Sequence, residues 1–302
     1  MSTQQVLFDI PGPRARVRHR VLAVLTLALF VAVAVWLLIQ LRAGGQLDAN
    51  KWMPFLQWRT WTTYLIPGIG GTLLAALIAI LIASPLALGL AMLRMSDVAP
   101  VRWVASVFVE FFRAVPVLIM MIFTYFWLSQ QEWSVDRWNP LIGVVTGLVL
   151  YNASVLCEVI RNGVASLPSG QREAGLSIGL STVQVRRSIL IPQALTAMMP
   201  SLVSQLVVIV KDTALGSIIL YYDLLTRSQQ LSSAFSNVVP AYIVAAVIYI
   251  LINYSISKVA ETLESRQRRK RRATGGQTTD GAGPTGVAGP AVDPLVEHNT
   301  KL

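Results

Sequence analysis

The chain has 302 residues, of which 54% are hydrophobic and only 13% are charged, and its formal net charge at pH 7 is +10. Soluble domains carry about 25% charged residues. Here the charged residues are fewer, and the chain contains uncharged apolar stretches of about 20 residues, the length that crosses a bilayer. These values exclude an ordinary soluble domain, and the single cysteine, Cys157, excludes an intramolecular disulfide and a cysteine metal cluster.

The N-terminal segment 1–20 is polar and basic, and it precedes an uncharged apolar stretch at 21–41. A secretory signal peptide has the same order, but its apolar core has about 7–15 residues and ends at a small-residue cleavage site. The stretch here is longer and ends in Gln40, Leu41 and Arg42. We therefore expect a retained first transmembrane helix.

Five more apolar stretches follow an outer-face loop at 42–66, whose tryptophans are typical of a membrane interface. The expected spans are 67–93, 103–128, 140–160, 194–220 and 240–259. Segment 261–302 begins with a basic run and continues as a Gly-, Thr-, Pro- and Ala-rich stretch that cannot bury a core. We therefore expect a disordered cytoplasmic tail.

Basic residues gather in alternate loops, and this indicates the orientation because cytoplasmic loops are enriched in Lys and Arg. One set of loops holds 18 Lys and Arg residues and the other holds 5. The larger set includes both termini and the central loop. The sequence thus predicts an all-α polytopic membrane protein with six transmembrane helices and cytoplasmic N and C termini.

The longest polar interruption between apolar segments covers residues 158–192. A short helix is permitted from about Gly170, and Gly179 is placed to be the left-handed residue just after its end. Ser181 and Gln184 have the spacing of a capping box, which begins a second helix. We therefore expect a helix-turn-helix at the membrane surface, a structure that usually docks onto a partner.

Three sets of ionisable residues lie inside or at the ends of the expected spans, where an ionised group costs at least about 2.5–3.5 kcal/mol. They are Glu110 with Arg113, Glu158 with Arg161, and Lys211 with Asp212. The i,i+3 spacing of the first two sets permits an ion pair on one helix face, which is the favoured interpretation for Glu158 and Arg161. Arg113 and Lys211 lie deeper, so lining a water-filled path or attracting an anionic solute is an equal alternative for them.

Two polar residues of the fourth span raise the same question. Asn152 and Ser154 are candidates for lining such a path, although Asn and Ser also make ordinary hydrogen bonds between membrane helices. Glu158 and Arg161 keep a second interpretation as a gate. The residues alone leave these alternatives open.

Motifs for other activities are absent or out of context. Residues 281–286 match a dinucleotide fingerprint formally, but they follow no strand and lie in the tail. No G-x-x-x-x-G-K-[ST] occurs, so we expect no ATP binding through a P-loop. The basic run 266–272 is better placed for anionic lipid headgroups than for nucleic acid. We predict neither catalysis nor a metal site in this chain.

The central stretch carries a longer signature. It reads Glu173-Ala174-Gly175-x-x-x-Gly179, then nine residues, then Ile189-x-Ile191-Pro192. This resembles the EAA loop of importer-type ABC permeases, whose pattern is E-A-A-x-x-x-G, nine residues, I-x-L-P. Gly175 and Ile191 depart conservatively from that pattern.

Four further elements, in the family's order, resemble the polar amino acid permease subfamily. They are Phe112-Arg113-Ala114-Val115-Pro116, Glu158-Val-Ile-Arg161-Asn-Gly163, Leu167-Pro168-x-Gly170-Gln171 and Lys211-Asp212-Thr213-Ala214-Leu215. The resemblance covers residues 67–260. With its extra first helix and long tail, the whole chain is most similar to the glutamate-system permeases of actinobacteria.

The resemblance implies a five-helix type I permease core at 67–260 in the bacterial cytoplasmic membrane, preceded by an accessory helix at 21–41. It implies a coupling loop at 161–193 that seats on a cytoplasmic ABC ATPase dimer, which would bind ATP and Mg in place of this chain. The coupling residues would be Glu173, Ala174, Gly175, Gly179, Ser181, Ile189 and Pro192. Two further partners are implied, an identical or sister permease subunit and an extracytoplasmic solute-binding protein.

We therefore expect the permease subunit of an ATP-driven importer for a polar amino acid, glutamate or a relative. The candidate residues for the translocation path or its gate are Arg113, Asn152, Ser154, Glu158, Arg161, Lys211 and Asp212. Two alternatives are an ion-coupled secondary amino acid transporter, which the deep charges permit, and a non-transporting membrane scaffold or channel. No internal repeat of the span pattern supports the first.

Overall fold

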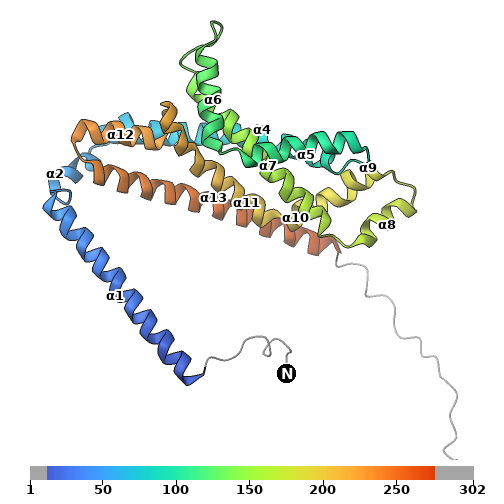
Figure 1. Ribbon diagram of the computed structural model, residues 1–302, viewed down its shortest axis with the longest axis horizontal. Coiled ribbons are helices and arrows are strands. Elements are labelled where there is room, and N and C mark those ends of the chain that lie inside the picture. Colours follow the sequence, from blue (N-terminus) through green and yellow to red (C-terminus); the bar gives the residue numbers. More distant parts are fainter. Residues whose placement is uncertain (1–11, 276–302) are drawn as a thin grey trace, which may run out of the picture. The chain divides into compact units, whose positions relative to one another are not determined.

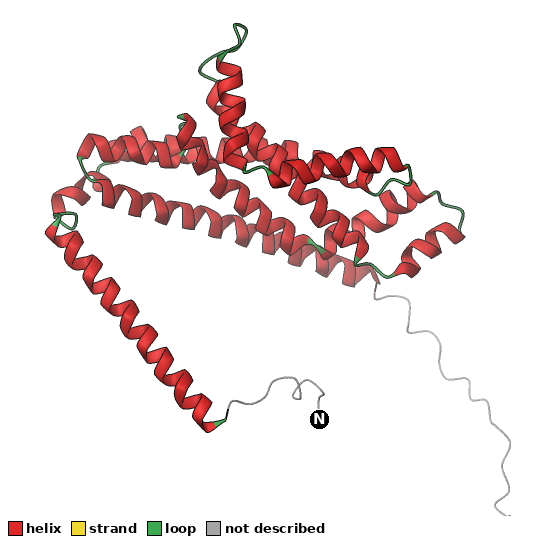
Figure 2. Cartoon of the chain, in the orientation of Figure 1, coloured by secondary structure: helices red, strands yellow, loops and turns green. Residues whose placement is uncertain are grey.

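The computed structural model describes residues 12–275, and every regular element in that range is a helix, as Figure 2 shows. Contacts divide the chain into two compact units, Met1–Ser257 and Lys258–Leu302, and the helical bundle belongs to the first. Five helices are long and apolar enough to cross a membrane, or six if one bent pair counts as a single span. The prediction of an all-helical membrane protein is confirmed.

The longer helices are labelled in Figure 1. They are α1 (Pro13–Ala43), α4 (Ile66–Arg94), α5 (Ala99–Ala114), α6 (Val117–Ser129), α7 (Asn139–Ala165), α11 (Met199–Asp212), α12 (Leu224–Phe235) and α13 (Val238–Gly275). The shorter elements are α2 (Ala49–Trp52), η2 (Met53–Leu56), α3 (Trp58–Thr60), η3 (Trp61–Leu65), α8 (Ser169–Ser177), α9 (Thr182–Val185), η4 (Arg186–Leu190), α10 (Ile191–Ala197) and η5 (Thr213–Ile219).

Helices α4 and α7 form the central pair of the bundle. The buried face of α4 presents alanines spaced by four residues, namely Ala75, Ala79, Ala83, Ala87 and Ala91, each with 0% of its surface exposed. Small side chains let two helices approach closely, which matters in lipid because the solvent there supplies no hydrophobic drive for association. On α7, a Cβ at Gly147 would lie only 2.6 Å from Met121 Cγ of α6, so α6 packs equally closely.

The expected third span, 103–128, is not one straight helix. It divides into α5 and α6, whose axes differ in direction by 96°. Val115 and Pro116 between them have extended backbone, with ψ values of 128° and 132°. A proline lacks the amide hydrogen of a helical residue and excludes the residue before it from the α region, so the chain turns here. The expected span 103–128 therefore corresponds to this bent pair, which counts as one span only if both helices cross the membrane together.

Several element boundaries also differ from the expected ones. The helix that contains the second span begins at Trp58, so residues 58–66 continue into the bundle and do not form part of a loop. The expected span 194–220 is interrupted at Met198, just before Pro200, where α10 gives way to α11. Proline is best tolerated in the first turn of a helix, and Pro200 takes that place in α11, which fits the interruption.

Residues 261–275, expected as the start of a disordered tail, are the helical end of α13. The physical reason is that residues 261–274 contain neither glycine nor proline and are rich in Glu, Gln, Lys and Arg, which favour helix. The remainder of the expected tail, 276–302, and the first residues, 1–11, lie outside the described range.

The first apolar stretch forms helix α1, as predicted. Its apolar side chains are exposed along the whole helix, for example Val24, Leu29 and Phe30 at 65–72%. A helix that is apolar on every side is typical of a segment surrounded by lipid. Its composition and length therefore fit a membrane span.

Candidate coupling loop and charge cluster

The central polar stretch folds as a helix-turn-helix, which confirms the prediction from its caps. Helix α8 ends in a Schellman motif, because the Leu180 amide donates to the Gly175 carbonyl and the Gly179 amide donates to the Leu176 carbonyl. Gly179 adopts a φ of +86°, a conformation that favours glycine. Ser181 then caps α9 in a complete capping box with Gln184.

The small residues of this loop have two different roles. Gly175 is buried, and a Cβ there would lie 2.8 Å from Val185 Cγ2 and 2.9 Å from Ile189 Cδ1, so it lets α8 pack against the second half of the loop. Glu173, Ala174 and Gly179 are exposed on the outside of α8 and its turn. Gly175 therefore serves the internal packing of the loop and presents no surface to a partner.

The same loop exposes apolar side chains that the sequence reasoning missed. Ile178 is 76% exposed, Val183 is 54% exposed and Leu176 is 38% exposed. Exposed apolar residues grouped on one polar segment are a typical mark of a contact surface. The signal in the sequence was the presence of three apolar residues within a stretch otherwise expected to lie in water.

The remaining candidate coupling residues lie in the second half of the loop. Ile189 is half-buried in η4, and Pro192 lies in the first turn of α10, where a proline is tolerated.

In the turn between α4 and α5, Asp97 contacts the second half of the loop. It accepts a hydrogen bond of 2.8 Å from the Thr182 hydroxyl and forms an ion pair with Arg186. The Thr182 hydrogen bond and the Arg186 guanidinium hold the pKa of the Asp97 carboxyl below its usual value. Sequence reasoning did not identify Asp97.

A cluster of five charged side chains lies at the same end of α4. Both predicted i,i+3 pairs form, with Arg161 2.5 Å from Glu158 and Arg113 3.7 Å from Glu110. Arg94, the last residue of α4, joins them, since its guanidinium lies 2.5 Å from Glu158 and 3.0 Å from Glu110. The Arg94 side chain is only 11% exposed. This guanidinium therefore links α4 to both α5 and α7 through one group.

The other candidate path residues lie elsewhere in the bundle. Lys211 is exposed at the end of α11, and Asp212 next to it is half-buried. Asn152 is fully buried in α7, where its amide donates to the Leu148 carbonyl and its side-chain oxygen accepts from Gln205 of α11 at 2.6 Å. Ser154 is also buried and donates to the Leu150 carbonyl. Asn152 thus takes part in a hydrogen bond between α7 and α11. The Lys211 side chain, in contrast, is exposed on the surface of this chain.

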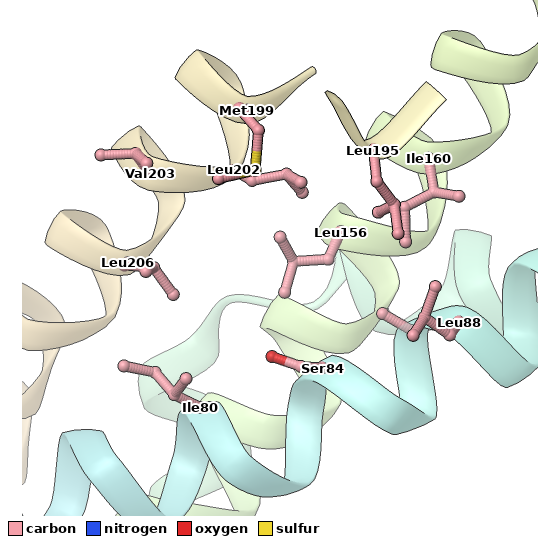
Figure 3. A pocket seen from close by; sticks show the side chains of 11 residues that line it. Ile80, Ser84, Leu88, Leu156, Ile160, Leu195, Met199, Leu202, Val203 and Leu206 are labelled. Atoms are coloured by element: carbon pink, nitrogen blue, oxygen red, sulfur yellow. The ribbon is translucent and has the colours of Figure 1, made fainter. Parts of the chain in front are cut away.

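A cavity of about 240 Å³ lies between α4, α7, α10 and α11. Its walls are aliphatic, and Ser84 supplies the one polar side chain among the residues that line it (Figure 3). An amino acid carries an ammonium and a carboxylate group, and burying either one without a partner is costly. This cavity therefore offers no binding site for such a solute.

Within residues 12–275, no three His, Cys, Asp or Glu side chains are grouped so that they could hold a metal ion.

Comparison with known proteins decides the family. Residues 80–269 match the family described as binding-protein-dependent transport system inner membrane component. The chain belongs to this family. It is accordingly a multi-pass protein of the cytoplasmic membrane with the type I ABC permease fold, a transport subunit and not an enzyme.

Its relatives are amino acid permeases. The glutamate transport system permease protein GluD of Corynebacterium glutamicum is 43% identical over 77% of this chain and 85% of its own length. A protein of Bacillus subtilis described as a probable glutamine ABC transporter permease, GlnP, is 34% identical over 68% of this chain and 94% of its own length. Among solved structures, an amino acid ABC transporter with histidines has a TM-score of 0.63 at 28% identity, covering 70% of this chain and 98% of its own.

Proposed function

We propose that this chain is the permease subunit of an ATP-driven importer whose substrate is a polar amino acid, glutamate before others. The observation that carries the choice of glutamate is the 43% identity to the glutamate permease over most of both chains. The excess of Lys and Arg in one set of loops supports cytoplasmic termini and a cytoplasmic coupling loop.

The coupling loop would seat on a cytoplasmic ATPase dimer through the outside of α8 and its turn. Glu173, Ala174 and Gly179 are exposed there beside the apolar Ile178 and Val183. Gly175, Ser181 and Ile189 would hold the shape of that surface from within, and Pro192 would set the start of α10. A second permease subunit, identical or a sister chain, would complete the pore, and a solute-binding protein would deliver the amino acid at the opposite face.

The path for the amino acid would lie on surfaces that this chain leaves uncovered. Arg113 and Lys211 have accessible cationic groups, which suit the carboxylates of glutamate. Asn152 and Ser154, which are buried and hydrogen-bonded, would contribute through helix packing. Glu158 and Arg161 would act in the ion-pair cluster, and Asp212 would lie beside the path next to Lys211.

Uptake into vesicles tests the transport proposal. The permease, reconstituted with its ATPase and binding protein, should accumulate radiolabelled glutamate only when ATP is supplied to the ATPase side, and excess unlabelled glutamate should compete better than other amino acids. Uptake driven by an ion gradient without any ATPase would instead establish the secondary-transporter alternative. ATP hydrolysis without accumulation of any amino acid would favour the scaffold or channel.

Two substitutions test the assignment of residues. Glu173→Ala should weaken co-purification of the ATPase and reduce uptake. Its control is Glu132→Ala, at an exposed glutamate in the loop before α7, which should leave both unchanged.

Arg113→Ala should reduce glutamate uptake without loss of the ATPase. Its control is Arg42→Ala, at another exposed arginine, which should leave uptake unchanged. Unchanged uptake in Arg113→Ala would remove that residue from the path.

A further inference from the structure

Two sets of contacts meet in one short turn at the end of α4. Arg94 ends that helix and holds Glu110 of α5 and Glu158 of α7. Three residues later, Asp97 holds Thr182 and Arg186 of the coupling loop. The turn is short and closed by hydrogen bonds, because the Ser96 amide donates to the Leu93 carbonyl and the Ser96 hydroxyl accepts from the Val98 amide.

The second set of contacts lies at the junction of α9 and η4, within the same packed unit as α8. Val185, beside Arg186, is buried and packs against Gly175 of α8. A displacement of α8 would therefore be carried to Arg186 by direct packing, since close-packed side chains shift together. Arg186 is itself 11% exposed, so its guanidinium is held in place at the Asp97 carboxylate.

The ion pairs of Arg94 with Glu110 and Glu158 can exchange partners. Arg94 lies between two carboxylates on two helices, and each carboxylate also has a second arginine, Arg113 or Arg161. If the turn moved, either glutamate would keep one cationic partner. Ion pairs with alternative partners permit two discrete arrangements at small cost, which is what a transmitted conformational change requires.

We infer that the turn at residues 94–97 transmits movement from the coupling loop to the charge cluster between α5 and α7, with Asp97 and Arg94 as its two positioning residues. This inference rests on the proposed function, because the movement originates where an ATPase would bind. It assigns a role to Asp97, Thr182 and Arg186, which are not among the residues proposed for the path. It also predicts that breaking either set of contacts separates ATP hydrolysis from transport.

The test uses the reconstituted complex and two readouts. One is the number of glutamate molecules taken up per ATP hydrolysed. The other is the rate at which N-ethylmaleimide labels Cys157, the only cysteine of the chain, which is fully buried next to Glu158. In the wild type, a non-hydrolysable ATP analogue should change the labelling rate, and this readout depends on no choice of substrate.

Asp97→Ala should keep the ATPase bound but lower both the uptake per ATP and the nucleotide-dependent change in labelling by about fivefold or more, the range of ordinary allosteric coupling. Asp97→Asn should lose less, because its oxygen still accepts from Thr182. The exchanged pair Asp97→Arg with Arg186→Asp should recover part of the loss. Asp136→Ala, an exposed aspartate in the loop before α7, is the matched control and should behave as the wild type.

Arg94→Gln should reproduce the loss, and the double variant Arg94→Gln with Asp97→Ala should be no worse than either single variant, because both act on one connection. Additive losses, or a wild-type response to nucleotide in Asp97→Ala, would overturn the inference. So would a wild-type complex whose Cys157 labelling ignores the nucleotide. Failure of the proposed function looks different, since the wild-type complex would then lack ATP-dependent uptake altogether.

Discussion

The two ends of α4 are held by different physical means. At its first turns, α12 lies so close that a Cβ at Gly68 would be 2.9 Å from Leu224 Cα, and the contacts nearby are buried hydrogen bonds. At its last residue, Arg94 takes part in ion pairs whose members include the 60%-exposed Glu110. The first end is buried and closely packed, and the second is charged and reaches solvent.

The closely packed end centres on Asp223, whose side chain is fully buried. Its carboxylate accepts hydrogen bonds from the Thr226 amide at 2.8 Å and the Tyr249 hydroxyl at 3.0 Å. Thr72 of α4 accepts from the Leu224 amide, and the Tyr221 hydroxyl donates to the Gly71 carbonyl. Buried networks in which each group is satisfied have one good geometry and are rigid. At the other end, the pairs of Glu110 with Arg94 and Arg113 reach solvent and are individually weak, and the more buried Arg94–Glu158 pair has Arg161 as an alternative partner for the glutamate.

The comparison teaches where the bundle can change shape. A conformational change at the Asp223 end would leave buried donors and acceptors unpaired, whereas a change at the Arg94 end exchanges one ion pair for another. We therefore expect stability to depend on the first end and coupling to depend on the second.

The largest effect is expected for Asp223→Leu. It leaves the Thr226 amide and the Tyr249 hydroxyl without their acceptor, which costs about 1–3 kcal/mol for each buried group. Thermal unfolding of the purified protein in detergent measures it. Asp223→Asn, which keeps an acceptor oxygen, is the control and should lose much less.

The wild type and Asp223→Asn should also differ in how their stability depends on pH. Burial raises the pKa of the Asp223 carboxyl, so the folded protein binds its proton more tightly than the unfolded chain does. Stability from this group is therefore present at acid pH and is lost as pH rises from the ordinary aspartate pKa through the raised one. The unfolding temperature of the wild type minus that of Asp223→Asn should be larger near pH 4 than near pH 7, and an opposite trend would contradict the assignment.

The next effect is expected for Gly71→Ala. The added Cβ would meet the backbone carbonyl of Tyr222, which cannot move without shifting α12, and overpacking of this kind costs about 1–3 kcal/mol. Gly70→Ala is the matched control because nothing lies within 4 Å of a Cβ at that position. Gly70→Ala should be neutral or slightly stabilising, since alanine favours helix. Equal unfolding temperatures for the two variants would show that the α4–α12 contact is looser than described.

A smaller effect on stability is expected for Arg94→Gln, of about 1 kcal/mol, because both glutamates keep another arginine. Arg113→Gln, whose guanidinium is 3.7 Å from Glu110 and 37% exposed, should lose less still. Raising the salt concentration should shrink the difference between Arg94→Gln and the wild type, because salt screens charges that reach solvent. The same salt should leave the effect of Asp223→Leu unchanged.

The smallest effect is expected for Gly175→Ala. Its Cβ would meet only the ends of the Val185 and Ile189 side chains, which can adjust, so the cost should stay below about 1 kcal/mol. Comparing the unfolding temperatures of Gly175→Ala and Gly71→Ala therefore measures how much less an added Cβ costs when its neighbours are side chains and not backbone. A loss in Gly175→Ala as large as in Gly71→Ala would show that the Val185 and Ile189 side chains cannot adjust to the added Cβ.

Much of this protein was determined by local sequence alone. Apolar length specified membrane helices because a bilayer requires internally satisfied backbone over about 20 residues. Gly179, Ser181 and Gln184 specified the helix-turn-helix because their cap hydrogen bonds lie within a few residues of each other. The i,i+3 pairs of Glu110 and Glu158 were predictable for the same reason.

Tertiary structure decided what depends on distant partners. Arg94 and Asp97 looked like ordinary charges of a short turn, and only packing placed them beside Glu158 and Thr182, which lie 64 and 85 residues away in sequence. The sequence analysis did not predict the bend at Pro116, since a proline permits either a kink or a full turn and the packing of α6 against α7 selects between them. Local hydrogen bonds fix helices and caps, whereas the meeting of remote charges requires the assembled bundle.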